Sequence, residues 1–384
     1  MPDAPSRLRF DRHELAGAFG DIGTDLPLLV ALVATCGLDA ASVCIVFGLL
    51  QIATGILYGI PMPVQPLKAM AVIMLASRLP VGVLAAGGLI VGAVMLVLAL
   101  TGALGLLARV VPKAVVRGIQ MGLGITLATL ALKQYAAADG ARGYAVAALS
   151  VAALLALRRQ HRVPAALVVI AGGLVYGVVV LLESPGSAIA FGLQLPSLVV
   201  PTREQLAQGA LLLALPQIAL SLGNSVIATS QATKDLFPDQ AVSVRKIGIT
   251  YGLMNLVGPW FGGMPACHGC GGLVGFYGFG ARTGGAPVIY GSLYLLVGLF
   301  FSSGFTQLAA VFPMPVLGVV LLFEALGLML LVRDVTAEPS QLWIALAVAA
   351  AVVGLPNGYV VGLVAGTLVA WSLRRGWVKP PTLE

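Results

Sequence analysis

The chain has 384 residues, of which 59% are hydrophobic and only 10% are charged. A soluble protein of this length cannot bury so much apolar surface, so the composition excludes a soluble globular fold. The formal net charge of +7 comes from basic residues in short loops, which is typical of membrane topology signals and not of a nucleic-acid surface. Apolar segments of about 20 residues recur along nearly the whole length and predict an all-α polytopic membrane protein.

We predict two sets of seven helical segments, each set containing one half-helix. The first set covers 14–36, 39–60, the half-helix 66–77, 81–100, 114–134, 143–157 and 163–183. A polar, proline-containing linker follows at 184–204. The second set covers 205–231, 246–262, the half-helix 268–279, 285–302, 315–332, 341–354 and 358–373.

Basic residues precede the first segment of this scheme and follow the fourth, sixth, eighth, tenth, twelfth and fourteenth. They are Arg7, Arg9, Arg12, Arg109, Lys113, Arg117, Arg158, Arg159, Arg162, Lys234, Arg245, Lys246, Arg282, Arg333, Arg374, Arg375 and Lys379. If every segment crosses, all of them lie on one side, which the positive-inside rule assigns to the cytoplasm. We therefore expect a cell-membrane protein with cytoplasmic termini, 1–13 and 374–384, and an extracytoplasmic linker. The N-terminus lacks the apolar core of a cleavable signal, so the first helix is expected to serve as an uncleaved one.

An odd number of segments in each half forces the repeats 14–183 and 205–373 to be inverted. Two short motifs recur at a spacing of about 200 residues, which supports such a repeat. Met62-Pro63 corresponds to Met264-Pro265, and Pro112 corresponds to Pro313. Inverted repeats with broken helices at corresponding positions are typical of secondary transporters.

Two proline-containing stretches, 61–68 and 263–269, interrupt the apolar sequence. Proline lacks an N–H and fixes φ, so it suits the first turn of a helix and not its interior. Each stretch therefore predicts an extended segment that leads into a half-helix within the membrane. Unpaired N–H groups at a helix start attract an anion, so two such starts facing each other predict a transporter's substrate site.

Several motifs resemble the molybdate transporter family, which is related to the sulfate permeases. They include GDIGTDLP at 20–27, PMPVQPLK at 61–68, VVRGIQ at 115–120, LPQIALSLGNS at 215–225, DLFP at 235–238 and MPACHGCGG at 264–272. The resemblance covers most of the chain. It implies the fold of uracil and sulfate permeases, in which a core domain holds the substrate between two half-helices beside a gate domain. It also implies molybdate uptake and, by analogy, a homodimer, and no appended regulatory domain is expected after Glu384.

A tetrahedral dianion must lose water before it is carried, and the protein has to replace that water with hydrogen-bond donors. The backbone N–H groups at the two half-helix starts, Gly269 among them, are the expected donors. The side-chain amides of Gln65, Gln217 and Asn224 are expected to add neutral donors, which select an anion and still release it. The alternative for Gln65 and Gln217 is helix-to-helix hydrogen bonding.

Two basic or titratable side chains begin the half-helices. His268 is expected to donate to the oxyanion or take up a coupled proton, and the alternative is that it fixes the broken backbone. Lys68 lies in a first turn, where a cation opposes the helix dipole. We expect it to attract the anion, and the alternatives are that it extends to the cytoplasmic side or pairs with Asp21 or Asp25.

Acidic residues within the segments are candidates for coupling. An intramembrane carboxylate such as Asp21 is costly, and it would repel a dianion if ionised. Proton coupling is therefore expected of Asp21 in preference to direct binding, with a structural pairing as the alternative. Thr24 is expected to contact the substrate. Glu324, midway along 315–332, is a second coupling candidate, although the family's acidic residue falls about a turn later.

Neither a metal nor a cofactor is expected. Cys267-His-Gly-Cys270 has the spacing of a metal or redox motif, but such sites usually need a second pair of ligands. The other two cysteines, Cys36 and Cys44, lie in apolar segments without that spacing.

The leading hypothesis is a secondary-active importer of molybdate that works by motion of core against gate. The nearest rival is the same machine carrying sulfate or oxyanions broadly, and tungstate should be accepted because its size and charge are nearly those of molybdate. A nucleobase permease would want carboxylates at the half-helices, where this chain has Gln and His. An anion channel would transport without saturation, and an enzyme would need a clustered nucleophile, base or metal set, which we do not find.

Overall fold

The computed structural model describes residues 7–104, 110–138, 140–157, 165–183 and 191–377. The first half comprises α1 (Arg12–Ala18), α2 (Ile22–Cys36), α3 (Ala40–Tyr58), β1 (Gln65–Pro66), α4 (Lys68–Ser77), α5 (Val81–Thr101), α7 (Lys113–Leu130), α8 (Gly140–Leu157) and α9 (Ala165–Glu183). The second half comprises α10 (Arg203–Gln208), α11 (Leu215–Ser221), α12 (Ala228–Leu236), α13 (Val244–Val257), β2 (Ala266–Cys267), α14 (Cys270–Gly278), α15 (Gly285–Phe300), α16 (Ser302–Val311), α17 (Met314–Leu330), α18 (Pro339–Gly354) and α19 (Gly358–Arg374).

Most predicted segments agree with these helices to within a few residues, but three details differ. The segment predicted at 14–36 is broken into α1 and α2, which meet at 45°. At this break, a Cβ on Gly20 would lie 2.4 Å from the carbonyl oxygen of Gly275, so the chain approaches α14 as only glycine allows. The segment predicted at 205–231 extends to Leu236 and contains the π-helical stretches Gly209–Ala214 and Leu222–Ile227. Helix α16 was not predicted, because ten residues are too few to meet a membrane-span criterion.

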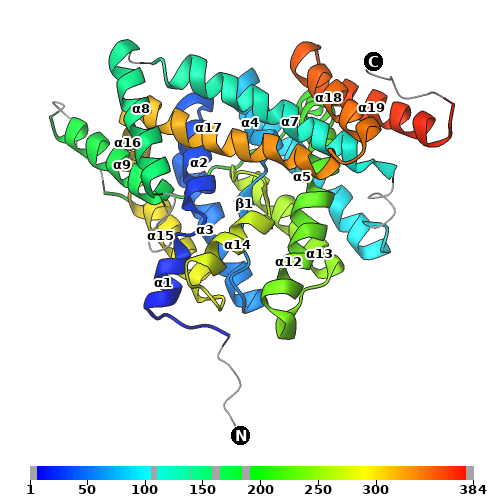
Figure 1. Ribbon diagram of the computed structural model, residues 1–384. Helices are drawn as coiled ribbons and strands as arrows, with labels where there is room; N and C mark the ends of the chain where they lie inside the picture. Colours follow the sequence, from blue (N-terminus) through cyan, green and yellow to red (C-terminus); the bar gives the residue numbers. More distant parts are fainter. Residues whose placement is uncertain (1–6, 105–109, 139, 158–164, 184–190, 378–384) are drawn as a thin grey trace, which may run out of the picture.

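The two predicted half-helices are present, and each follows a short strand. Strands β1 and β2 pair antiparallel at the middle of the molecule, with Gln65 opposite Cys267 and Pro66 opposite Ala266 (Figure 1). Proline fixes φ in this region, and this favours extended backbone immediately before α4. The pairing brings the starts of α4 and α14 together, although they are separated by about 200 residues in the chain.

The same side-chain device holds both strands. Gln51 on α3 donates from Nε2 to the Val64 carbonyl at 2.9 Å and accepts from the Val64 N–H at 3.3 Å. Asn255 on α13 makes the same two contacts with Ala266, at 2.6 and 2.9 Å. A helix of each half therefore makes the same pair of side-chain hydrogen bonds to the strand region of that half, as expected for an inverted repeat.

The helices form two groups, which we call the core and the gate. In the core, α1–α5 pack with α11–α15, and α3 lies against α15 while α5 lies against α13. In the gate, α7 packs against α17 and α18, and α8 packs against α9 and α17. In Figure 1 the gate helices α7, α17 and α18 run across the upper part of the molecule, above the core helices α12, α13 and α14.

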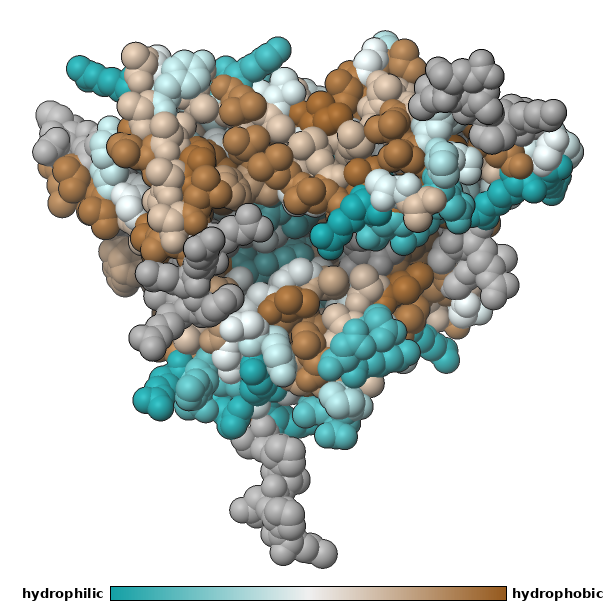
Figure 2. Space-filling view, viewed as in Figure 1, coloured by the Kyte–Doolittle hydropathy of each residue, from teal (hydrophilic) through white to brown (hydrophobic). Residues whose placement is uncertain are grey.

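The outer surface of the described residues is apolar over broad areas (Figure 2). By length and composition, five described helices can cross a membrane, or seven if each of two bent helix pairs counts as one span. Shorter apolar helices of 10–17 residues include α4, α15, α18 and α19. The cytoplasmic location of the termini stays a prediction. Some of the residues on which the predicted topology depends lie outside the described part of the chain. They are the basic residues Arg109, Arg158, Arg159, Arg162 and Lys379 and the linker residues 184–190.

Candidate functional site

A cavity of about 410 Å³ lies where the two half-helix starts of the core meet the gate. The space-filling view shows a recess with hydrophilic residues between two largely apolar masses (Figure 2). The core contributes Gly20, Asp21, Thr24, Gln65, Lys68, Ala69, Gln217, Leu220, Ser225, Cys267, Gly269, Cys270 and Gly271 to its lining, and the gate contributes Gln120, Leu123, Phe323, Glu324, Gly327, Leu328 and Leu331. Most of the predicted site residues are thus brought together around one cavity.

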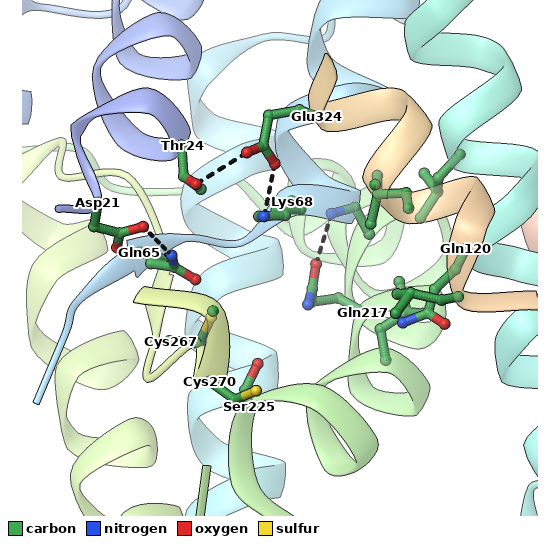
Figure 3. Close-up of a pocket in the computed structure, with 18 of the residues that line it drawn as sticks. Asp21, Thr24, Gln65, Lys68, Gln120, Gln217, Ser225, Cys267, Cys270 and Glu324 are labelled. Atoms are coloured by element: carbon green, nitrogen blue, oxygen red, sulfur yellow. Dashed lines mark hydrogen bonds and ion pairs between the residues drawn. The ribbon is translucent and has the colours of Figure 1, made fainter. Parts of the chain in front are cut away.

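The start of α4 is capped by Gln217 from α11. The Oε1 atom of Gln217 accepts from the backbone N–H groups of Ala69 at 3.1 Å and Met70 at 3.3 Å (Figure 3). Its Nε2 donates to the Ser221 hydroxyl at 3.0 Å, and that hydroxyl lies 2.7 Å from the Tyr251 hydroxyl. Gln217 therefore lines the cavity, but in this state it satisfies the α4 start by helix-to-helix hydrogen bonding.

Gln65 is also held by another side chain of the core, that of Asp21. Its Nε2 donates to both carboxylate oxygens of Asp21, each at 2.7 Å (Figure 3). Two glycines of the β2–α14 region let this pair approach. A Cβ on Gly269 would lie 1.6 Å from Gln65 Oε1, and a Cβ on Gly272 would lie 2.3 Å from Asp21 Oδ2. The break between α1 and α2 is thereby packed directly against the start of α14.

An ion pair joins the core to the gate across the cavity. Lys68 Nζ lies 2.8 Å from Glu324 Oε2, and Thr24 donates from its hydroxyl to Glu324 Oε1 at 2.9 Å (Figure 3). Lys68 pairs with Glu324 rather than with Asp21 or Asp25, which were the partners considered from the sequence. A second cavity of about 210 Å³ is lined by Thr24 and Glu324 as well, so this contact borders both spaces.

Asp25 lies one helical turn beyond Asp21 and is fully buried. Neither of its carboxylate oxygens has a hydrogen-bond partner within the described residues. A buried carboxylate without partners is strongly disfavoured in its charged form. The structure therefore adds Asp25, which does not itself line the cavity, to the buried acidic groups near the cavity-lining Asp21.

Two predicted contacts lie elsewhere or are not described. His268 is fully buried and is not among the lining residues of the cavity. Its Nδ1 lies 2.9 Å from the Pro63 carbonyl oxygen and its Nε2 lies 2.8 Å from the Thr250 hydroxyl. This position fits the alternative of a histidine that fixes the broken backbone. The side chain of Asn224 lies outside the described part of the structure.

Several lining residues received no role in the sequence analysis, notably Gln120, Ser225, Cys267 and Cys270. Gln120 carried a signal, because it is a lone amide within the apolar segment predicted at 114–134. Ser225 carried none, since small side chains of this kind occur throughout membrane helices. The spacing of the two cysteines pointed to a metal or redox motif and not to an anion site.

Comparisons with known proteins agree on one family. A family model described as molybdate transporters of the MFS superfamily matches residues 13–127 and 209–328. Molybdate transporter 1 of Arabidopsis thaliana is 31% identical over 418 residues, covering 96% of this chain and 90% of the relative. Molybdate transporter 2 of the same plant is 34% identical over 373 residues, covering 85% and 80%.

The fold also matches a solved structure. The transmembrane domain of a cyanobacterium bicarbonate transporter, BicA, gives a TM-score of 0.65 at 17% identity, over 94% of this chain and 97% of that one. The predicted fold class, an all-α polytopic membrane protein of the sulfate-permease type, is confirmed. The matched family consists of transporters, which also confirms the prediction that the chain is not an enzyme.

Proposed function

Because this chain belongs to the molybdate transporter family, we propose that it imports molybdate into the cell by secondary-active transport. The observation that carries the proposal is the cavity of about 410 Å³, where two half-helix starts, Lys68 and several amides meet at the junction of core and gate. Dehydrated oxyanions need convergent N–H donors and a positive charge, and this arrangement supplies both.

The start of α14 is the backbone element best suited to hold the anion. The α4 amides of Ala69 and Met70 are already taken by Gln217. Gly271, by contrast, lines the cavity with open space where a Cβ would be, so an anion can approach the backbone there. We assign direct contacts to Gly269 and the backbone beside it, to Lys68 and to Thr24. Gln65 and Gln217 contribute once their present partners are exchanged, and Asn224 is proposed as a further contact from its place in the sequence.

Lys68 binds the anion by changing partners. The ammonium group is paired with Glu324 in this state, and an arriving dianion competes for it. Because Lys68 belongs to the core and Glu324 to the gate, that exchange loosens a contact between the two groups of helices. Motion of core against gate would then open the cavity to one side of the membrane and then to the other.

Proton uptake accompanies this exchange. Asp21 and Glu324 line the cavity and Asp25 is buried one helical turn from Asp21, and negative charge on these groups opposes a dianion. We assign coupling to these three carboxyl groups, since each proton that they take up removes one repulsive charge. The plasma membrane is the proposed location, with both termini cytoplasmic and a homodimer as the assembly.

A binding titration tests the substrate. Purified protein is titrated calorimetrically with molybdate, tungstate, sulfate and uracil. We expect saturable binding of molybdate and tungstate, weaker binding of sulfate and none of uracil. A preference for sulfate would favour the rival of a sulfate or general oxyanion transporter, and uracil binding would overturn the anion site. Uptake into proteoliposomes that does not saturate with concentration would favour a channel.

A further inference from the structure

Gln120 is an amide of the gate that faces the cavity with an unused donor. It lies on α7, is 1% exposed and lines the cavity (Figure 3). Its Oε1 accepts from Arg117 Nη1 at 2.9 Å. Its Nε2 has no hydrogen-bond partner within the described residues. A buried side-chain NH2 group without an acceptor is energetically unfavourable, so we infer that a ligand supplies the acceptor.

The orientation of this amide is fixed by charge. A guanidinium group only donates hydrogen bonds, so the oxygen of Gln120 must face Arg117 and the nitrogen must face away from it. Arg117 is itself anchored by an ion pair with Asp334, whose carboxylate also lies 3.6 Å from Lys113 Nζ. A guanidinium bound to the amide oxygen also polarises the amide and strengthens its N–H groups as donors.

The other two cavity-lining glutamines differ from Gln120 in this respect. The Nε2 atom of Gln65 is engaged by Asp21, and that of Gln217 is engaged by Ser221. Both belong to the core, and both are satisfied within it. Gln120 therefore offers a donor on the gate side of the cavity, opposite the half-helix starts.

We propose that Gln120 is the gate-side ligand of the transported oxyanion. It donates its N–H groups to an oxygen of the anion while Lys68 and the α14 start hold the others. This inference rests on the proposed function of oxyanion transport. A tetrahedral anion has acceptor oxygens on all sides, so it contacts core and gate at once. The site therefore favours tetrahedral oxyanions over ligands that present acceptors on one edge only.

The test compares affinities of the purified full chain for molybdate by calorimetry. Gln120→Met removes both N–H groups at nearly constant volume, and we expect the dissociation constant to rise about tenfold. The matched control is Gln307→Met, the same change at a glutamine of α16 that does not line the cavity, and its affinity should equal that of the wild type. The melting temperature of each variant is measured alongside to establish folding.

Gln120→Asn is the second variant. It keeps the amide but withdraws it from the cavity by one methylene. It therefore tests whether the amide must reach the anion, even if the Met variant fails to fold. We expect weaker molybdate binding here too. Wild-type affinity in either folded variant would overturn the role of Gln120. No molybdate binding by the wild type would instead overturn the proposed function, so the two failures are distinguishable.

Discussion

Glu324→Gln should tighten anion binding while slowing transport. In the present state Glu324 occupies Lys68 at 2.8 Å, and a dianion must displace it. A hydrogen bond between charged groups contributes about 1.5–3 kcal/mol, and its neutral counterpart contributes about 1 kcal/mol. The substitution therefore lowers the free-energy cost of displacement by about 0.5–2 kcal/mol, which corresponds to about 2- to 30-fold tighter binding. Uptake should fall, because the carboxylate no longer competes the anion off Lys68.

The assay pairs calorimetry of molybdate binding with uptake into proteoliposomes. The single amide oxygen of the variant can accept from Thr24 or from Lys68, so part of this contact is kept and folding should be retained, and a melting curve checks this. Glu204→Gln, at an exposed position on α10, is the matched control and should change neither quantity. Unchanged or weaker binding in folded Glu324→Gln protein would refute the exchange of partners at Lys68.

Three further predictions follow from the same contacts. Gly269→Ala should lower the melting temperature and abolish molybdate binding, because its Cβ would lie 1.6 Å from Gln65 Oε1. Gly271→Ala has open space at its Cβ, so this variant should fold normally and only its binding of molybdate should weaken. Asp25→Asn should keep or raise thermal stability, since a buried carboxyl without partners is lost, and should weaken the dependence of proteoliposome uptake on an imposed proton gradient. His268→Phe should lower the melting temperature because the hydrogen bonds to Pro63 and Thr250 are lost, while the folded fraction binds molybdate with wild-type affinity. A large loss of affinity at unchanged stability would instead mean that His268 contacts the substrate.

The half-helices were predictable because their cause is local. Proline restricts its own backbone and that of its neighbour, so the extended residues before α4 and α14 follow from a few positions. Helix spans were predictable for a similar reason, since a bilayer fixes the length and polarity of each segment. The break between α1 and α2 was not, because it depends on Gly20 meeting a carbonyl some 250 residues away in the chain.

The partners of the site residues depend on how the halves dock, and the sequence does not specify that. Lys68 and Glu324 are 256 residues apart, and Gln217 reaches α4 across 148 residues. Sequence reasoning proposed these residues as donors of an anion site and treated the donors as free. In the structure, acceptor atoms of the protein already bind most of these donors. Among the described lining residues, Gln120 has an amide donor without an acceptor.

The charge around the cavity explains why such a site would release what it binds. If Asp21 and Glu324 are ionised and the buried Asp25 is neutral, these groups together with Lys68 carry −1 before any anion enters. A dianion would bring the total to −3, which a weakly solvated interior does not tolerate. The proposed mechanism therefore links anion binding to protonation of these carboxyl groups, and in it their deprotonation restores the competitor at Lys68. A purely cationic pocket would bind more tightly, but it would lack this means of expelling its cargo.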